Sequence, residues 1–205
     1  QTKNGKISGV DAGSCQLYLG VPYAQAPVGA LRFAPPSPVE PWEGVMACDT
    51  PTPLCFQGEI RVQSPYYREF YDEDKYRLPM DEDCLRVDIR VPKGREGQKL
   101  PVAFWIHGGA FMSGYSFEKE FDGNALCEEG LILVSVSYRC NIFGFFSCKE
   151  LSAEQGTSGN YGILDQIAAL KWVYENIEAF GGDPQCITAF GQSAGCMSVQ
   201  TLVSS

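Results

Sequence analysis

The chain has 205 residues, 44% of them apolar and 20% charged, and its 16 Lys and Arg against 25 Asp and Glu give a formal charge of −9. This composition is that of a folded globular protein and excludes disordered, collagen-like and low-complexity classes. An acidic balance with no Lys/Arg cluster excludes a surface that follows phosphates, so we expect neither nucleic acid nor an anionic membrane as a partner.

The first hundred residues are rich in proline and turns, as at positions 20–23, 27–29 and 35–38. They contain only short apolar pieces, which predict a small antiparallel region with long connections. Residues 1–20 lack the basic and apolar regions of a signal peptide. The longest apolar stretches, 102–106 and 131–136, fall far short of the ~20 residues that cross a bilayer, so no transmembrane segment is expected.

Residues 66 to 83 are acidic and aromatic and have no clear period. They predict a long excursion over the surface, for which two interpretations stand. One is a solvated loop whose rings pack on the body beneath it; the other is a lid or wall at the entrance of a site.

After Pro101 the pattern changes to short apolar runs that alternate with helix, which is typical of buried parallel strands in an α/β protein. We predict strands over 102–106, 131–137 and 186–190. Between Asn160 and Phe180 the apolar residues recur at three- and four-residue spacing, which predicts an amphipathic helix. The sequence Gly181-Gly182-Asp183-Pro184 is expected to end it.

The last predicted strand leads into Gly191-Gln192-Ser193-Ala194-Gly195, a G-x-S-x-G sequence followed by helix-compatible residues to 203. Strand, tight turn and helix form the context in which such a serine projects its hydroxyl above a sheet as a nucleophile. A turn made tight only for packing is the alternative interpretation. The correct context on both sides favours Ser193 as the nucleophile.

A second loop of small residues, His107-Gly108-Gly109-Ala110-Phe111, directly follows the strand over 102–106. Such a loop can turn backbone N–H groups toward one point, which acyl transfer requires for the negative charge that develops on the carbonyl oxygen. The predicted oxyanion hole consists of the amides of Gly109, Ala110 and Ala194. The alternative is a βα turn kept small for packing.

His107 is the only histidine of the chain. It belongs to the predicted oxyanion loop rather than to a loop opposite the nucleophile, so we interpret it as a buried structural imidazole and not as the catalytic base. Ser193 then has no base among these residues, although acylation needs one within hydrogen-bond reach.

The nine cysteines are many for an enzyme, but their number is odd and several lie within apolar segments. We therefore expect most to be reduced and buried, which favours a reducing, cytoplasmic compartment over secretion. A zinc site is not expected because no C-x-x-C pair exists and His107 has no matching cysteine cluster. We expect no metal and no cofactor.

Taken together, these segments resemble the type-B carboxylesterase family, the α/β-hydrolases that include cholinesterases, carboxylesterases, bacterial para-nitrobenzyl esterases and fungal lipases. The resemblance runs in order through nearly the whole chain. It is carried by residues 18–24, 27–29, 31–33, 82–85, 91–92, 105–111, 137–139, 143–145, 159–162, 165–166, 169–173, 176–177, 180–184 and 191–195.

The resemblance implies an α/β-hydrolase fold, with a mostly parallel central sheet flanked by helices and an N-terminal antiparallel region. It implies scaffold ion pairs between Arg32 and Glu82 and between Arg139 and Asp165. Cys55 and Cys84 match positions that are disulfide-bonded in secreted relatives. Residues 66 to 83 match the family's loop beside the site entrance. The resemblance therefore favours the second interpretation of this stretch, a wall that shapes the substrate site.

Three departures from the family stand in this sequence. Gln192 replaces the usual Glu before the nucleophile, and Ala110 replaces a frequent third Gly; both are tolerable because the backbone amides act. The chain ends at Ser205, whereas the family's acid and His lie well beyond the nucleophile. We therefore expect residues 1–205 to be the N-terminal portion of a single α/β-hydrolase domain.

The resemblance implies a serine carboxylic-ester hydrolase (EC 3.1.1.-) that acts on a small-molecule ester through an acyl-enzyme on Ser193. The remainder of the hydrolase chain would supply the acid and the His, so the isolated 205 residues are predicted to be inactive. A catalytically silent, cholinesterase-like binding module is the alternative, although its usual mark is loss of the nucleophile, and Ser193 is present.

Overall fold

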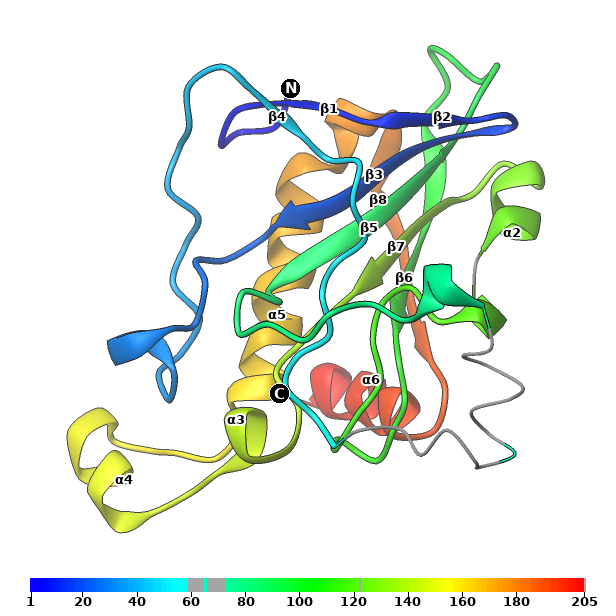
Figure 1. Cartoon of the computed structure of the whole chain (residues 1–205). Helices are drawn as coiled ribbons and strands as arrows, with labels where there is room; N and C mark the ends of the chain where they lie inside the picture. Colours follow the sequence, from blue (N-terminus) through cyan, green and yellow to red (C-terminus); the bar gives the residue numbers. More distant parts are fainter. Residues whose placement is uncertain (59–64, 66–72, 122, 205) are drawn as a thin grey trace.

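The computed structural model describes residues 1–58, 65, 73–121 and 123–204 (Figure 1). The strands in these ranges are β1 (Lys6–Ser8), β2 (Val10–Ala12), β3 (Cys15–Pro22), β4 (Val45–Ala47), β5 (Arg86–Pro92), β6 (Leu100–Ile106), β7 (Ile132–Val136) and β8 (Gly182–Gly191). The α-helices are α2 (Asn124–Glu128), α3 (Asn141–Phe145), α4 (Lys149–Gln155), α5 (Tyr161–Asn176) and α6 (Ala194–Ser204). Short 3₁₀ helices are η1 (Gly29–Leu31), η2 (Asp74–Tyr76), η3 (Lys119–Phe121) and η4 (Ile177–Phe180).

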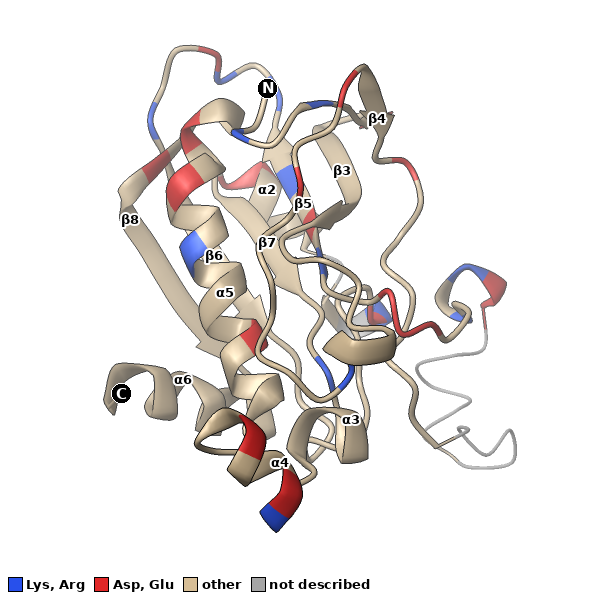
Figure 2. Cartoon of the chain, turned by 90° about the vertical axis from the view of Figure 1, so that its left-hand side faces the viewer, with Lys and Arg blue, Asp and Glu red and all other residues tan. Residues whose placement is uncertain are grey.

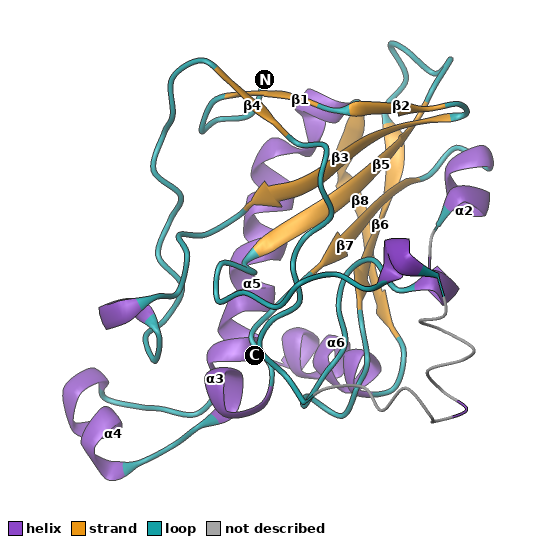
Figure 3. Cartoon of the chain, in the orientation of Figure 1, coloured by secondary structure: helices purple, strands orange, loops and turns teal. Residues whose placement is uncertain are grey.

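The main sheet has the strand order β2-β3-β5-β7-β6-β8 (Figure 3). The pairs from β2 to β7 are antiparallel, whereas β6 is parallel to both β7 and β8. This arrangement confirms the predicted antiparallel first half and the parallel strands after Pro101. Beside the main sheet, β1 and β4 form a small parallel pair, which the turn-rich sequence does not predict.

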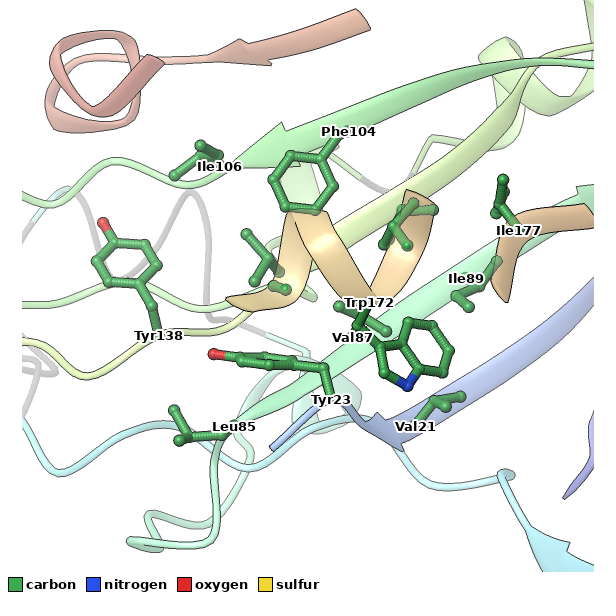
Figure 4. Close-up of a cluster of buried hydrophobic side chains, with 14 of the residues drawn as sticks. Val21, Tyr23, Leu85, Val87, Ile89, Phe104, Ile106, Tyr138, Trp172 and Ile177 are labelled. Carbon is green, nitrogen blue, oxygen red and sulfur yellow. The ribbon is translucent and has the colours of Figure 1, made fainter. Parts of the chain in front are cut away.

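Both faces of the parallel strands are covered, which explains why these strands read as continuous apolar runs. On β6, Val102, Phe104 and Ile106 belong to the main core, in which α5 contributes Trp172 (Figure 4). The alternate residues Ala103 and Trp105 belong to a second cluster with Leu133, against which Phe121, Leu126 and Phe190 pack. The period of two along β6 therefore places the sheet between two apolar layers.

The predicted helix is confirmed as α5 continued by η4, and it ends at Gly181, whose φ is +85°. Glycine is suited to that left-handed position because it has no Cβ. Strand β8 begins at Gly182, earlier than the predicted 186–190, because Gly182 pairs with Leu100 of β6. Pro184 is accommodated in it because β8 pairs with β6 alone among the described strands, and an edge strand tolerates a residue without an N–H.

Two ion pairs join segments that are distant in the sequence, and other charged residues lie on loops, helices and strands (Figure 2). Arg32 contacts Glu82 with Nε–Oε2 at 2.6 Å and Nη2–Oε1 at 2.7 Å. The buried pair joins Arg139 to Asp165, with Nη2–Oδ1 at 2.7 Å and Nε–Oδ2 at 2.8 Å. Both pairs implied by the family resemblance are thus present.

Candidate active site

The two loops predicted to carry the chemistry emerge side by side at the carboxyl ends of β6 and β8. Ile106 is the register partner of Gly191, so the loop after β6 and the turn after β8 begin at the same level of the sheet. The strand order also reverses at β6, because the chain passes from β6 to β7 on one side and later to β8 on the other. Open α/β sheets bind ligands at such switch points.

Ser193 lies in the turn between β8 and α6, and its backbone has φ +55°. A left-handed conformation at a residue with a Cβ costs about 1–2 kcal/mol and is kept where the surroundings enforce it. The flanking glycines provide that enforcement. A Cβ on Gly195 would overlap the Ile106 carbonyl oxygen, and one on Gly191 would lie 2.8 Å from the same oxygen. The sequence therefore folds into a strained, closely packed turn that leaves the Ser193 side chain exposed.

The predicted oxyanion loop lies against this turn. A Cβ on Gly108 would lie 2.8 Å from the Gln192 carbonyl oxygen and 3.2 Å from the Ser193 Cβ. Within the described part of the chain, the amides of Gly109, Ala110 and Ala194 donate no hydrogen bond. Three backbone donors near the Ser193 turn are thus free to bind an external acceptor. The structure brings all the predicted site residues of both loops into one region.

His107 is buried, and its geometry is that of a structural residue. Its Nδ1 lies 2.9 Å from the Gly108 carbonyl oxygen, so that nitrogen carries the proton, and the ring stacks on Tyr138 at 4.3 Å between centroids. Burial lowers the pKa of His107 to about 4, with the Gly108 contact acting in the opposite direction. The imidazole is therefore neutral near pH 7.

Cys55 and Cys84 are buried free thiols that lie next to each other. The Cys84 thiol donates a hydrogen bond to the Cys55 sulfur, which lowers the pKa of Cys55, and the Cys140 amide donates to the same sulfur at 3.3 Å. A disulfide joins Cys15 to Cys127 instead, across 112 residues of sequence. No spacing rule in the sequence indicates that pair.

The sequence predicts that most cysteines are buried, and the other free cysteines follow this prediction only in part. Cys48 and Cys140 are buried, whereas Cys186 and Cys196 are exposed. Cys196 is on α6, directly after the predicted elbow; a cysteine there suggests a small packing residue, but its side chain is exposed, so that interpretation is wrong.

Residues 66–72 of the acidic, aromatic stretch lie outside the described residues, whereas 73–83 are described. In its described part, Tyr76 is buried, its ring lies 6.1 Å from that of Phe117, and its carbonyl accepts a hydrogen bond from the Tyr115 hydroxyl at 2.9 Å. A ring of this stretch therefore packs on the body of the protein. Whether the stretch walls a site stays a prediction.

Two residues near the site were not singled out from the sequence. Gln57 contacts the backbone of Gly114, and Asn141 contacts that of Phe111 and Met112. Isolated amide side chains in loops give no pattern, so only the structure reveals these contacts.

Comparison with known proteins gives concordant matches. A model described as the carboxylesterase family matches residues 1–205. Carboxylesterase 1F of Mus musculus is 43% identical over 189 residues, which cover 91% of this chain and 33% of that protein. Cocaine esterase of Homo sapiens is 42% identical over 202 residues, covering 96% of this chain and 34% of the relative.

Solved structures agree with these relatives. A thermophilic PNB esterase superimposes with a TM-score of 0.86 at 41% identity, covering 98% of this chain and 40% of the other. A carboxylesterase of Geobacillus stearothermophilus gives a TM-score of 0.83 at 40% identity, covering 100% and 40%. The α/β-hydrolase fold is thereby confirmed. The chain spans about a third of the length of the curated relatives that it matches.

Proposed function

The chain belongs to the carboxylesterase family, and from this we propose that it carries the nucleophile and oxyanion hole of a serine carboxylic-ester hydrolase. One observation carries the proposal. Ser193, at φ +55° between β8 and α6, lies against a loop in which the amides of Gly109 and Ala110 donate to no described residue. A strained serine beside unpaired donors suits attack on a carbonyl carbon.

In this mechanism the Ser193 Oγ attacks the ester carbonyl of a small-molecule substrate as a general base takes its proton. The carbonyl oxygen becomes negatively charged and accepts hydrogen bonds from the amides of Gly109, Ala110 and Ala194. The Ala194 amide lies at the N-terminus of α6, where the helix dipole also favours negative charge. The alcohol then leaves, and water releases the acid from the acyl-enzyme in a second step.

His107 does not fit the role of the base. Its Nδ1 is engaged with the Gly108 carbonyl, the ring is buried, and its pKa of about 4 leaves it a poor proton acceptor at neutral pH. We propose that the triad's His and acid come from polypeptide beyond residue 205, the remainder of a single hydrolase domain of which residues 1–205 are the N-terminal portion.

The open side of β8 is the surface that this remainder would cover. An apolar groove of about 530 Å³ lies between α5, β8 and α6, and it is lined by Ile167, Leu170, Tyr174, Ile187, Ala189 and Leu202. Tyr174 is 53% exposed and Met197 on α6 is 60% exposed. The outer edge of β8 pairs with no strand in the described ranges, and apolar side chains beside such an edge favour burial against further structure.

The proposal is tested with a fluorophosphonate probe on the full-length protein. We expect the probe to label Ser193, as mapped by peptide mass spectrometry, and Ser193→Ala to abolish labelling. Ser204, an exposed serine of α6, should remain unmodified. Labelling that survives Ser193→Ala would refute the nucleophile assignment, and absence of labelling in the wild type would favour the catalytically silent binding module.

The isolated 205-residue chain provides a second test. We expect it to hydrolyse para-nitrophenyl esters no faster than its Ser193→Ala variant, because the nucleophile has no base. Turnover by the isolated chain that depends on Ser193 would show that the base is present within residues 1–205.

A further inference from the structure

The oxyanion loop contains three consecutive residues in the left-handed region. The φ values are +94° at Gly109, +55° at Ala110 and +61° at Phe111. Glycine adopts this region without penalty, but Ala and Phe each cost about 1–2 kcal/mol. Such a conformation persists only where surrounding contacts enforce it.

Contacts within the loop account for only part of that enforcement. The amides of Met112 and Ser113 donate to the Gly109 carbonyl at 2.9 and 3.1 Å, which closes the turn around Gly109. These two hydrogen bonds do not hold the second half of the loop, residues 111–114, which therefore depends on contacts with other segments. Two segments distant in sequence perform this task.

Gln57 holds Gly114 by both of its backbone polar groups. The Gly114 amide donates to Gln57 Oε1 at 2.7 Å, and Gln57 Nε2 donates to the Gly114 carbonyl at 3.5 Å. A primary amide matches a peptide group because it presents a donor and an acceptor side by side. This contact spans 57 residues and therefore fixes the loop from the first half of the chain.

Asn141 holds the other side of the same half loop. The backbone amide of Asn141 donates to the Phe111 carbonyl at 2.7 Å. Its side-chain Nδ2 donates to the Met112 carbonyl at 3.5 Å and to the Phe56 carbonyl. Asn141 itself has φ +47°, a conformation that Asn tolerates better than other residues with a Cβ. Through Phe56 it also ties the loop to the segment that carries Gln57.

We propose that Gln57 and Asn141 are positioning residues that set the oxyanion-hole amides of Gly109 and Ala110. This inference rests on the proposed function, since it gives these amides their role. The Gln57 side chain joins the 56–57 segment to the oxyanion loop. The Asn141 side chain joins the start of α3 to both of these segments. Neither side chain contacts the described atoms of Ser193, so both act through the loop.

The experiment compares variants of the full-length protein, with all rates expressed per Ser193 labelled by fluorophosphonate. Gln57→Ala removes both contacts with Gly114, whereas Gln57→Glu keeps an acceptor for the Gly114 amide and loses the donor. Asn141→Gly keeps the left-handed backbone and removes the two Nδ2 donations, together with the Oδ1 that accepts from the Phe143 amide at 3.3 Å. Gln25→Ala is the control, because Gln25 is a surface residue whose Nε2 contacts Glu40 at 3.1 Å.

Removing one oxyanion donor costs about 10²–10³ in kcat, so donors that are displaced but not removed should cost less. We expect kcat of Gln57→Ala and Asn141→Gly to fall about tenfold or more, with KM within about twofold, and Gln57→Glu to lose less than Gln57→Ala. The Ki of a trifluoromethyl ketone, which forms an oxyanion on the nucleophile, should rise in proportion to the loss of kcat/KM. Gln25→Ala should match the wild type.

A merely structural role predicts a different result: fewer labelled molecules, with kcat and Ki per labelled site unchanged. That result in both Gln57→Ala and Asn141→Gly overturns the inference. If a variant does not fold, Gln57→Glu, with its expected smaller loss, decides in the same way. Absence of Ser193 labelling in the wild type would instead overturn the proposed function, so the two failures are distinguishable.

Discussion

Acidification should destabilise the folded protein through His107, the one histidine of the chain. The ring is 1% exposed, is stacked on Tyr138 and contacts the Gly108 carbonyl, so nothing in its described surroundings stabilises an imidazolium charge except that single contact. Its second nitrogen, Nε2, is buried without a hydrogen-bond partner in the described structure. Lowering the pH therefore forces either a buried charge or unfolding.

The magnitude follows from the two pKa values. The pKa of His107 is about 4 in the folded state against 6.5 for the unperturbed side chain. As the pH falls, the unfolded chain binds the proton first, so the stabilising contribution is fully present above pH 6.5 and is lost between pH 6.5 and 4. Between pH 7.5 and 4.5 the free energy of unfolding should drop by about 2.5 kcal/mol from this residue alone.

The assay is guanidinium unfolding of the full-length protein at pH 7.5, 6.0 and 4.5, with His107→Asn as the comparison. Asn can still donate to the Gly108 carbonyl, but it does not titrate. The cavity that it leaves lowers stability equally at every pH. Subtracting the two pH profiles therefore isolates the His107 contribution from all other titrating groups.

We expect the wild type to lose about 2.5 kcal/mol more than His107→Asn on going to pH 4.5. Parallel pH profiles for the two proteins would refute the reasoning, because they would mean that His107 has the same pKa in the folded and unfolded states. A difference of the opposite sign would mean that the imidazolium is stabilised in the fold.

Three further outcomes are expected. Asp165→Asn should lower the free energy of unfolding by about 3–5 kcal/mol, as measured by guanidinium titration, because it leaves the buried Arg139 charge without its counter-ion; a loss below 1 kcal/mol would contradict this. Gly195→Ala should abolish fluorophosphonate labelling, since its Cβ would overlap the Ile106 carbonyl; normal labelling would show that the elbow can relax. Ser193→Ala should also abolish labelling, while its unfolding midpoint stays within a few degrees of the wild type because the side chain is exposed.

The sequence predicted the parts of this protein that depend on local pattern. The strand over 102–106 was predicted correctly because burial on both faces gives a continuous apolar run. The helix after Asn160 was predicted correctly because burial of one face repeats apolar residues at three- and four-residue spacing. The loops at His107 and Ser193 were recognisable because small residues stand where a strand ends. Their placement in one region follows from the parallel pairing of β6 with β8.

What could not be predicted depends on contacts between distant, unpatterned residues. Cys15 and Cys127 are bonded because β3 and α2 approach each other in the fold, and their sequence separation carries no signal. Gln57 reaches Gly114 through a loop for which no period exists. The start of β8 was placed too late because Gly182, Asp183 and Pro184 are typical of a turn, whereas edge pairing with Leu100 extends the strand through them.

Strand β6 lies between β7 and β8, which are translated at different times, and this order affects how the nascent chain can pair. β7 follows β6 closely and can pair with it at once, but α3, α4 and α5 must all be translated before β8 appears. At about 5–20 residues per second, one edge of an apolar strand stays unsatisfied for several seconds, which makes the nascent chain prone to mispairing. Because Gly191 and Gly195 pack closely on the Ile106 carbonyl, the Ser193 turn can take its shape only after β8 has paired with β6.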